Sequence, residues 1–225
     1  MGVGLWADMK NKMIVIDGVD GSGKGVQTRR LHQALLHSGL RSLLTREPGG
    51  SKAAEDIRKL LVEGEPEKWD SMTELLLMYA ARRSHLNRTI LPALQQGQWV
   101  VCDRFADSSR AFQGIAGELG LEVVEKIHQL VVGSFAPDMV LILDIPESLA
   151  LERALARGGA EDRFEKKGEL YQSRVRQAFL QIATSDSQRY QVIDANQPID
   201  EVTQDIFDIV NGQYQLSLEL NKGIE

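Results

Sequence analysis

A glycine-rich loop near the start of the chain constrains the fold more than any other part of the sequence. Residues 18–25 read Gly-Val-Asp-Gly-Ser-Gly-Lys-Gly and fit the pattern G-x-x-x-x-G-K. A short apolar run at 13–17 precedes the loop, and leucines recur at helical spacing between 24 and 39. In such a loop the backbone N–H groups turn inward around phosphate oxygens, and the helix N-terminus adds positive potential. The sequence therefore predicts a strand, a phosphate-binding loop and a helix in that order.

The loop departs from the usual pattern at its last position. Lys24 stands where a lysine bridges the outer phosphates of ATP, but Gly25 replaces the Ser or Thr whose hydroxyl binds Mg²⁺. Val26 supplies no substitute, so either the metal is held through water and carboxylates or catalysis is impaired. The Gly-Lys-Gly string is similar to the loop of adenylate kinases, which favours the first alternative. The predicted ATP phosphate-binding residues are Gly18, Asp20, Gly21, Ser22, Gly23, Lys24, Gly25 and Val26.

Apolar runs and helical patterns alternate along the rest of the chain. The apolar runs predict strands at 13–17, 41–45, 99–102, 139–143 and 190–193. The helical patterns predict helices at 24–39, 52–63, 70–96, 106–116, 121–134, 146–156, 169–184 and 198–211. Strands that alternate with helices form a parallel sheet covered on both faces. We therefore expect an α/β protein with a three-layer P-loop NTPase fold, in which a five-stranded parallel sheet carries helices on both faces and a lid segment.

The same pattern predicts how the chain is divided. Residues 1–12 form an N-terminal extension, 13–211 a single P-loop domain, and 212–225 a C-terminal tail. A charged segment with two adjacent glycines, at about 157–168, is interpreted as a mobile lid.

Composition narrows the class of protein. The formal net charge of the 225 residues is −6, which argues against a nucleic-acid-binding surface. The single cysteine, Cys102, excludes an internal disulfide and lies in an apolar run typical of a buried strand. The four histidines lack metal-ligand spacing. No run of about eighteen apolar residues and no apolar leader region is present, so we expect a soluble, cytoplasmic protein that binds no membrane.

Two further motifs follow the second and third predicted strands. The first, at 45–50, reads Thr-Arg-Glu-Pro-Gly-Gly, and the second, at 103–114, reads Asp-Arg-Phe-Ala-Asp-Ser-Ser-Arg-Ala-Phe-Gln-Gly. Ligands bind beyond the carboxyl ends of the strands in sheets of this kind, so both motifs belong at the site. With Ala-Ala-Arg at 80–82 and Glu-Asp-Arg-Phe at 161–164, the sequence closely resembles the thymidylate kinase family over about residues 13–211.

The resemblance implies a dTMP pocket with defined roles. Arg82 and Arg104 match arginines that grip the dTMP phosphate, for which a planar guanidinium suits better than lysine. Asp20 matches the residue that contacts the sugar 3′-hydroxyl. Ser109 and Gln113, one helical turn apart, match residues that read the thymine edge. The implied dTMP-binding residues are Asp20, Arg46, Glu47, Met78, Arg82, Arg104, Ser109, Phe112 and Gln113.

The same resemblance implies the catalytic residues Lys24, Asp103, Arg104 and Arg163. Asp103 ends a strand near the phosphates and is the candidate metal residue, acting through water. Because the loop carries Gly21 rather than Arg after its carboxylate, the lid must supply the arginine that stabilises the transferred phosphoryl group. That combination is typical of the bacterial class of the family. The lid arginines are Arg153, Arg157 and Arg163.

The implied activity is transfer of the γ-phosphoryl group of ATP to dTMP, giving dTDP and ADP in dTTP synthesis, with Mg²⁺ as cofactor and a homodimer as the assembly. Two positions depart from the family: Met78 replaces a Phe that stacks on thymine in many relatives, and Phe112 replaces a Tyr. They keep open a kinase for another (deoxy)pyrimidine nucleoside monophosphate. Gly25 and Val26 keep open a nucleotide-binding relative that no longer turns over.

Overall fold

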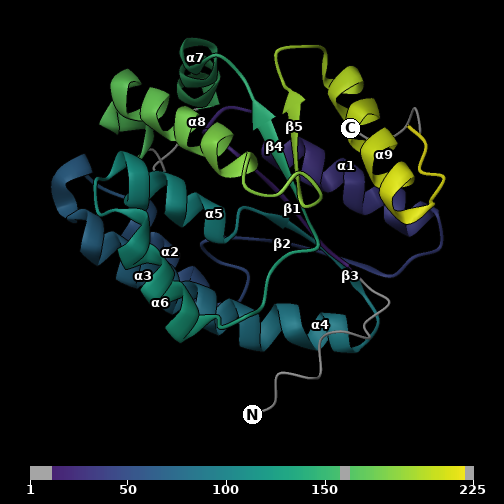
Figure 1. Cartoon of the computed structure of the whole chain (residues 1–225), viewed down its shortest axis with the longest axis horizontal. Coiled ribbons are helices and arrows are strands. Elements are labelled where there is room, and N and C mark those ends of the chain that lie inside the picture. Colours follow the sequence, from purple (N-terminus) through teal and green to yellow (C-terminus); the bar gives the residue numbers. More distant parts are fainter. Residues whose placement is uncertain (1–11, 158–162, 221–225) are drawn as a thin grey trace.

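The central sheet has the predicted strands and the predicted parallel arrangement. The computed structural model describes residues 12–157 and 163–220, apart from the side chains of Leu155 and Arg157. Five parallel strands are ordered β2-β3-β1-β4-β5 in one sheet (Figure 1). Their bounds are β1 Met13–Gly18, β2 Ser42–Arg46, β3 Trp99–Asp103, β4 Met139–Asp144 and β5 Tyr190–Asp194.

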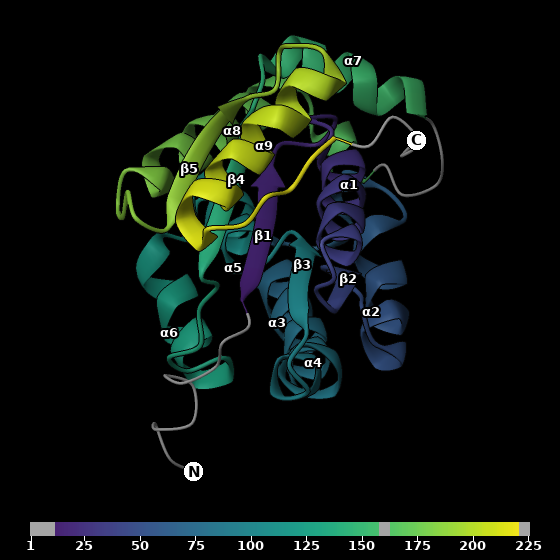
Figure 2. The same cartoon turned by 90° about the vertical axis from the view of Figure 1, so that its right-hand side faces the viewer.

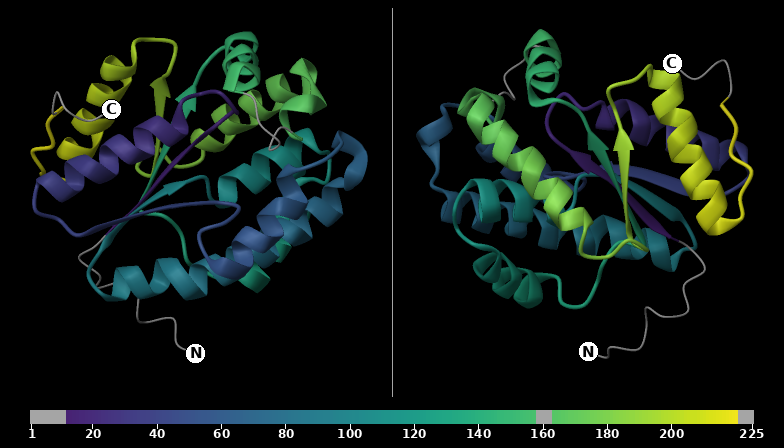
Figure 3. Two further views of the ribbon diagram at one scale, coloured as in Figure 1. Left: turned by 180° about the vertical axis from the view of Figure 1, so that it is seen from behind. Right: turned by 45° about the horizontal axis from the view of Figure 1, so that its top comes forward.

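Helices cover both faces of the sheet, which confirms the expected α/β class. Helices α1 and α9 pack together on one face, whereas α8 packs on β4 and β5 from the other (Figure 3). A side view places α1 and α6 on opposite sides of β1 (Figure 2). The helices are α1 Lys24–His37, α2 Lys52–Val62, α3 Ser71–His85, α4 Leu91–Gln95, α5 Ala106–Ser109, α6 Leu121–Val131, α7 Glu147–Arg157, α8 Glu169–Ala183 and α9 Ile199–Tyr214.

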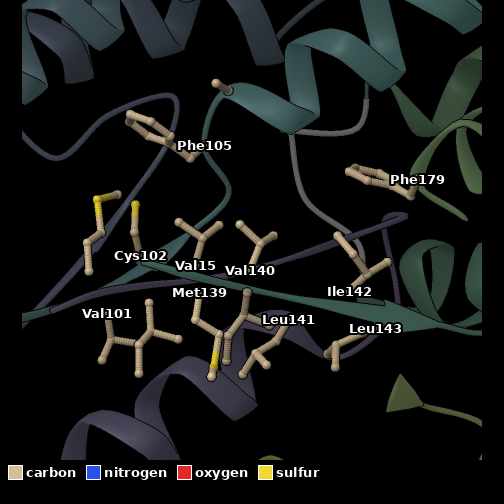
Figure 4. Close-up of a cluster of buried hydrophobic side chains, with 14 of the residues drawn as sticks. Val15, Val101, Cys102, Phe105, Met139, Val140, Leu141, Ile142, Leu143 and Phe179 are labelled. Atoms are coloured by element: carbon tan, nitrogen blue, oxygen red, sulfur yellow. The ribbon is translucent and has the colours of Figure 1, made fainter. Parts of the chain in front are cut away.

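The hydrophobic core lies on both sides of the central strands. Side chains of β4 alternate between the two faces, with Met139 and Leu141 toward one layer of helices and Val140 and Ile142 toward the other (Figure 4). All of them are buried. Cys102 also lies in this core, as its apolar setting predicts, and burial raises the pKa of its thiol well above the usual range. A strand that is apolar on both faces must be central, which agrees with the position of β4 in the sheet.

The long helix predicted at 70–96 is interrupted. Helix α3 ends at His85, a π-helical turn spans Leu86–Ile90, and α4 follows. Pro92 has no backbone N–H to donate, so a regular α-helical ladder cannot run through it, and the wider turn lies immediately before it. A second π-helical segment, Arg110–Ala116, continues α5 and completes the helix predicted at 106–116.

The carboxyl ends of three neighbouring strands bring the sequence motifs together. In the sheet Arg46 is paired with Asp103, and Asp103 is paired with Ile16. The N–H of Glu47 donates to the carbonyl of Asp103 at 2.8 Å, and the N–H of Arg104 donates to that of Ile16 at 3.0 Å. The residues that follow β1, β2 and β3 therefore share one edge of the sheet, as the fold predicts.

The packed part of the chain extends beyond the predicted domain end at 211. Helix α9 continues to Tyr214, and Leu218 is buried with a 3% exposed side chain. Asn211 holds this stretch, because its side chain exchanges hydrogen bonds with the backbone of Leu218. Within residues 12–157 and 163–220, no helix combines the length and the apolar character needed to cross a bilayer.

Candidate active site

One cavity of about 660 Å³ lies at the carboxyl ends of β1, β2 and β3. Most of the predicted site residues line it: Asp20, Gly21, Gly23, Lys24, Gly25, Val26, Arg46, Glu47, Met78, Arg82, Asp103, Arg104, Ser109, Phe112, Gln113 and Arg153. Gly18 and Ser22 belong to the loop but do not line the cavity, and neither does Arg163. The cavity is large enough for a nucleotide-sized ligand.

The glycine-rich loop is built as the motif predicts. Gly21 and Gly23 have φ values of 81° and 94°, which L side chains rarely adopt. A Cβ on Gly21 would overlap the carbonyl oxygen of Ala150, so the loop packs directly against α7. Helix α1 begins at Lys24, which places its N-terminal N–H groups at the cavity. This arrangement is the usual one for binding phosphate.

Lys24 is buried yet lines the cavity. The residue is only 6% exposed, and its Nζ donates to the carbonyl of Val19 at 2.6 Å. Burial first, and then the positive charge of Arg104, lower the pKa of Lys24 to about 8. An ammonium that is poorly solvated gains most from an anionic partner, and a nucleotide phosphate would supply one.

Gly25 leaves space beside Asp103. A Cβ on Gly25 would lie 3.7 Å from Oδ2 of Asp103 and 3.6 Å from Nη1 of Arg29, which is ordinary contact. Asp103 lines the cavity, but the described residues contain no cluster of three or more His, Cys, Asp and Glu side chains that could hold a metal. One carboxylate fits Mg²⁺ that keeps several waters and also binds substrate phosphates. Arg29 also lines the cavity and was not predicted.

Arg104 is held in a fixed position by several partners. Its φ is 68°, in the left-handed region, and its guanidinium lies 5.1 Å from the centre of the Phe112 ring. Nη2 donates to Oδ1 of Asp20 at 2.6 Å, and Nη1 donates to Oδ1 of Asp17 at 3.2 Å. Burial opposes the charge, but Asp20 and Asp17 raise the pKa of Arg104 above its usual value. The arginine therefore stays charged at the cavity wall.

Asp17 was not predicted as a site residue. It is fully buried at the end of β1 and accepts hydrogen bonds from Arg104 and from the Ser108 hydroxyl, the latter at 2.7 Å. Burial raises the pKa of Asp17 to about 6, although Arg104 and Ser108 oppose this shift. The signal in the sequence was one acidic residue inside an otherwise apolar strand, which is rare unless the carboxylate has a partner.

Arg82 forms a second buried network, with Glu47. Its Nε donates to Oε2 of Glu47 at 2.7 Å, and both Nη atoms lie 3.1 Å from the Ser109 hydroxyl. His85 Nδ1 lies 3.0 Å from Oε1 of Glu47, and its Nε2 lies 2.7 Å from the Thr45 hydroxyl. Since a carboxylate only accepts, Nδ1 donates to Glu47. His85 belongs to the site through this contact, and its spacing gave no indication of it.

Burial alone would raise the pKa of Glu47, but Arg82 and His85 together hold it below its usual range. Tyr79 supports the same arginine from the core side, with the centre of its ring 4.5 Å from the guanidinium carbon of Arg82. Met78, by contrast, lines the cavity. The two neighbours on α3 therefore face different surroundings, as the expected helical spacing allows.

Arg163 is not where its predicted role requires. It is fully buried and donates to the carbonyls of Leu61, Glu65, Pro66 and Trp69. Its Nη2 also donates to Oε1 of Glu74 at 2.6 Å. These contacts tie this part of the lid segment to the end of α2 and to the connection between α2 and α3. In this structure Arg163 is a structural residue, and delivery of its charge to a phosphoryl group is not supported.

The other lid arginines have different positions. Arg153, on α7, lines the cavity and donates to the carbonyl of Ala195 at 3.5 Å. The side chain of Arg157 and residues 158–162 lie outside the described residues, so the first half of the predicted lid at 157–168 does too. Arg46 lines the cavity with a half-exposed side chain that pairs with Glu55 at 3.1 Å. Of the arginines predicted to reach the phosphates from the lid, Arg153 is thus the one placed at the cavity among the described side chains.

Comparison with known proteins gives one consistent family. The sequence matches a model of the thymidylate kinase family over residues 16–206. The thymidylate kinase of Dinoroseobacter shibae is 50% identical over 87% of this chain and 94% of its own. That of Caulobacter vibrioides is 47% identical over 88% of this chain and 94% of its own.

A solved structure shows the same similarity. The crystal structure of thymidylate kinase from Ehrlichia chaffeensis aligns with a TM-score of 0.73 and 29% identity, covering 89% of this chain and 98% of that one. The glycine-rich loop at 18–25 and the residues that line the cavity all lie within the segment 16–206 that matches the family model. The chain therefore belongs to the thymidylate kinase family.

Proposed function

We propose that this protein transfers the γ-phosphoryl group of ATP to dTMP, giving dTDP and ADP. The observation that carries the proposal is that one cavity combines the phosphate-binding loop with Arg82, Arg104 and Gln113. A kinase for a nucleoside monophosphate needs both a triphosphate site and an acceptor site within reach of each other. The high identity to curated thymidylate kinases supports dTMP as the acceptor.

In this reaction the protein forms no covalent intermediate and mainly binds and positions the two substrates. Lys24 and the loop N–H groups bind the triphosphate, and Arg104 and Arg82 bind the acceptor phosphate. Since the transfer proceeds in line through a loose transition state, the rate comes mainly from positioning and from stabilised negative charge. Asp103 would hold Mg²⁺ through water, and bound Mg²⁺ would neutralise charge on the phosphates. Arg153 is the lid-side arginine that lines the cavity.

A coupled assay of ADP release tests the proposal. The protein would be supplied with ATP and Mg²⁺ and with dTMP, dUMP, dCMP, UMP or AMP as the acceptor. We expect fast release with dTMP and much slower release with AMP. Release with another pyrimidine nucleotide but not with dTMP would reassign the substrate. Binding of ATP without transfer to any acceptor would contradict the proposed kinase activity.

The space beside Gly25 leads to a testable prediction about the Mg²⁺ requirement. In Gly25→Ser the added hydroxyl would lie beside Asp103 and supply the missing ligand. We expect the Mg²⁺ concentration for half-maximal rate to fall by about threefold or more. Gly25→Ala is the matched control, because it adds the same Cβ without the oxygen and should leave the requirement unchanged. An equal change in both variants would show that the hydroxyl is irrelevant.

We further propose that the protein is a homodimer in the cytoplasm. Helices α3 and α6 pack against each other and expose large apolar side chains, with Leu76 53% and Leu130 85% exposed. Exposed apolar side chains of this size are typical of interfaces between subunits. Equilibrium sedimentation should give twice the chain mass of 25.0 kDa, and the chain mass alone would refute the dimer. Cell fractionation would check the compartment.

A further inference from the structure

Gln113 presents a buried acceptor that has no donor within the described part of the chain. The residue is 1% exposed and lines the cavity, and its Oε1 has no hydrogen-bond partner there. Buried carbonyl oxygens are almost always hydrogen-bonded in folded proteins. An unpartnered one in the wall of a ligand cavity therefore points to a donor on the ligand.

The orientation of this amide is set by Glu74, which lies behind it on α3. Glu74 is fully buried, and its Oε2 accepts a hydrogen bond from Nε2 of Gln113 at 3.1 Å. A carboxylate only accepts hydrogen bonds, so it selects the NH₂ group of the amide and rejects the oxygen. With Nε2 held by Glu74, Oε1 has to lie on the other side of the planar amide group.

Two cations bind the other carboxylate oxygen of Glu74. Oε1 of Glu74 accepts from Nη2 of Arg163 at 2.6 Å and from Nζ of Lys167 at 2.7 Å. Both bonds join an ion to an ion, and such bonds are about twice as strong as neutral ones. The buried Arg163 thus has a role in the site after all, although it acts through Glu74 and not on a phosphate.

We propose that Glu74 is a positioning residue for base specificity, because it fixes Gln113 with its carbonyl oxygen toward the nucleobase. The fixed acceptor selects a pyrimidine with a ring N–H at position 3, as in thymine and uracil. Cytosine has a lone pair at that nitrogen, which would face the lone pairs of Oε1. Rotating the amide to accept cytosine would place the oxygen against the Glu74 carboxylate. This inference rests on the proposed function, in that the acceptor is a pyrimidine nucleotide.

The fixed amide of Gln113 can distinguish only some of the pyrimidines. Thymine and uracil both carry the N3–H group, so Glu74 contributes nothing to the choice between dTMP and dUMP. Only the choice against dCMP depends on it. A general distortion of the pocket would alter all three affinities, and the two ratios therefore separate specificity from structure.

The experiment measures binding of dTMP, dUMP and dCMP by calorimetry in the full-length protein and its variants. In Glu74→Gln the new amide can face Gln113 with either end, so Gln113 can rotate. We expect the ratio of Kd for dCMP to Kd for dTMP to fall at least about tenfold, since a pocket with a fixed hydrogen-bonding group rejects an analogue far more strongly than an adaptable one. The ratio for dUMP to dTMP should stay within about twofold.

Lys167→Met is the matched control. It removes one cation from the same cluster but leaves the contact between Glu74 and Gln113, so the dCMP-to-dTMP ratio should remain close to that of the unmodified protein. Because E74Q leaves the buried Arg163 and the half-buried Lys167 without their anion, it is also combined with K167M. The double variant E74Q/K167M restores the net charge of the cluster and should show the same loss of discrimination as E74Q.

An unchanged dCMP-to-dTMP ratio in E74Q and E74Q/K167M would overturn the inference, and so would an equal change in the dUMP-to-dTMP ratio. Unmodified protein that binds dCMP as tightly as dTMP would overturn it too. Failure of the proposed function has a different signature, because the coupled assay would then show no phosphoryl transfer to dTMP whatever the binding ratios are.

Discussion

Replacing Lys24 by alanine is expected to lower kcat/KM for ATP by about a thousandfold, the upper end of the loss seen when one preorganised donor to a developing charge is removed. Lys24 lines the cavity from the first turn of α1, and among the described residues its Nζ donates only within the loop, to Val19 at 2.6 Å and to Ser22 at 3.5 Å. The coupled assay of ADP release measures the loss, and a thermal melt checks that the variant folds. A loss below about tenfold in a folded variant would contradict the assigned role.

The titration of Lys24 should also make kcat/KM for ATP depend on pH. Burial and the charge of Arg104 lower the pKa of Lys24 to about 8, so its charge is present below that pH and is lost above it. We therefore expect kcat/KM for ATP to decrease as the pH rises through 8. Lys24→Arg is the control, because a guanidinium stays charged, and its profile should lack this alkaline decrease even if its rate is lower.

Replacing Arg82 by leucine should produce the largest loss of stability among the site residues. The guanidinium is 1% exposed, and its Nε donates to the 4% exposed Glu47 at 2.7 Å. Removing one partner of a buried ion pair leaves an uncompensated charge, so the free energy of unfolding should fall by about 3–5 kcal/mol. Urea denaturation followed by circular dichroism measures it.

Two further variants show whether the loss comes from the buried charge. Arg83→Leu is a control on the next residue, whose exposed side chain donates to the carbonyl of Val131 at 2.9 Å, and it should cost less than about 1 kcal/mol. The double variant R82L/E47L removes both charges and should be more stable than R82L alone. Additive effects of the two substitutions would mean that Arg82 and Glu47 do not interact energetically.

Local pattern in the sequence was enough for the fold and for most of the cavity. The apolar runs predicted all five strands of the sheet to within one residue at each end. Parallel strands place their carboxyl ends at one edge, so the motifs that follow β1, β2 and β3 had to meet there. The glycine-rich loop, Arg82, Arg104 and Gln113 line one cavity for that reason. Local periodicity also missed the π-helical turn before Pro92, where a missing N–H changes the ladder.

Only the tertiary structure decided the buried polar contacts. Glu74 meets Gln113 and Arg163, which are 39 and 89 residues away along the chain. Asp17 likewise meets Arg104, 87 residues away, and Glu47 meets His85, 38 residues away. Residue type and spacing along one element do not report such partners, whereas a buried charge persists only where a partner from another element reaches it. For this reason the sequence placed Arg163 at a phosphate, whereas in the structure it lies against Glu74. Its partner was set by the packing of separate elements.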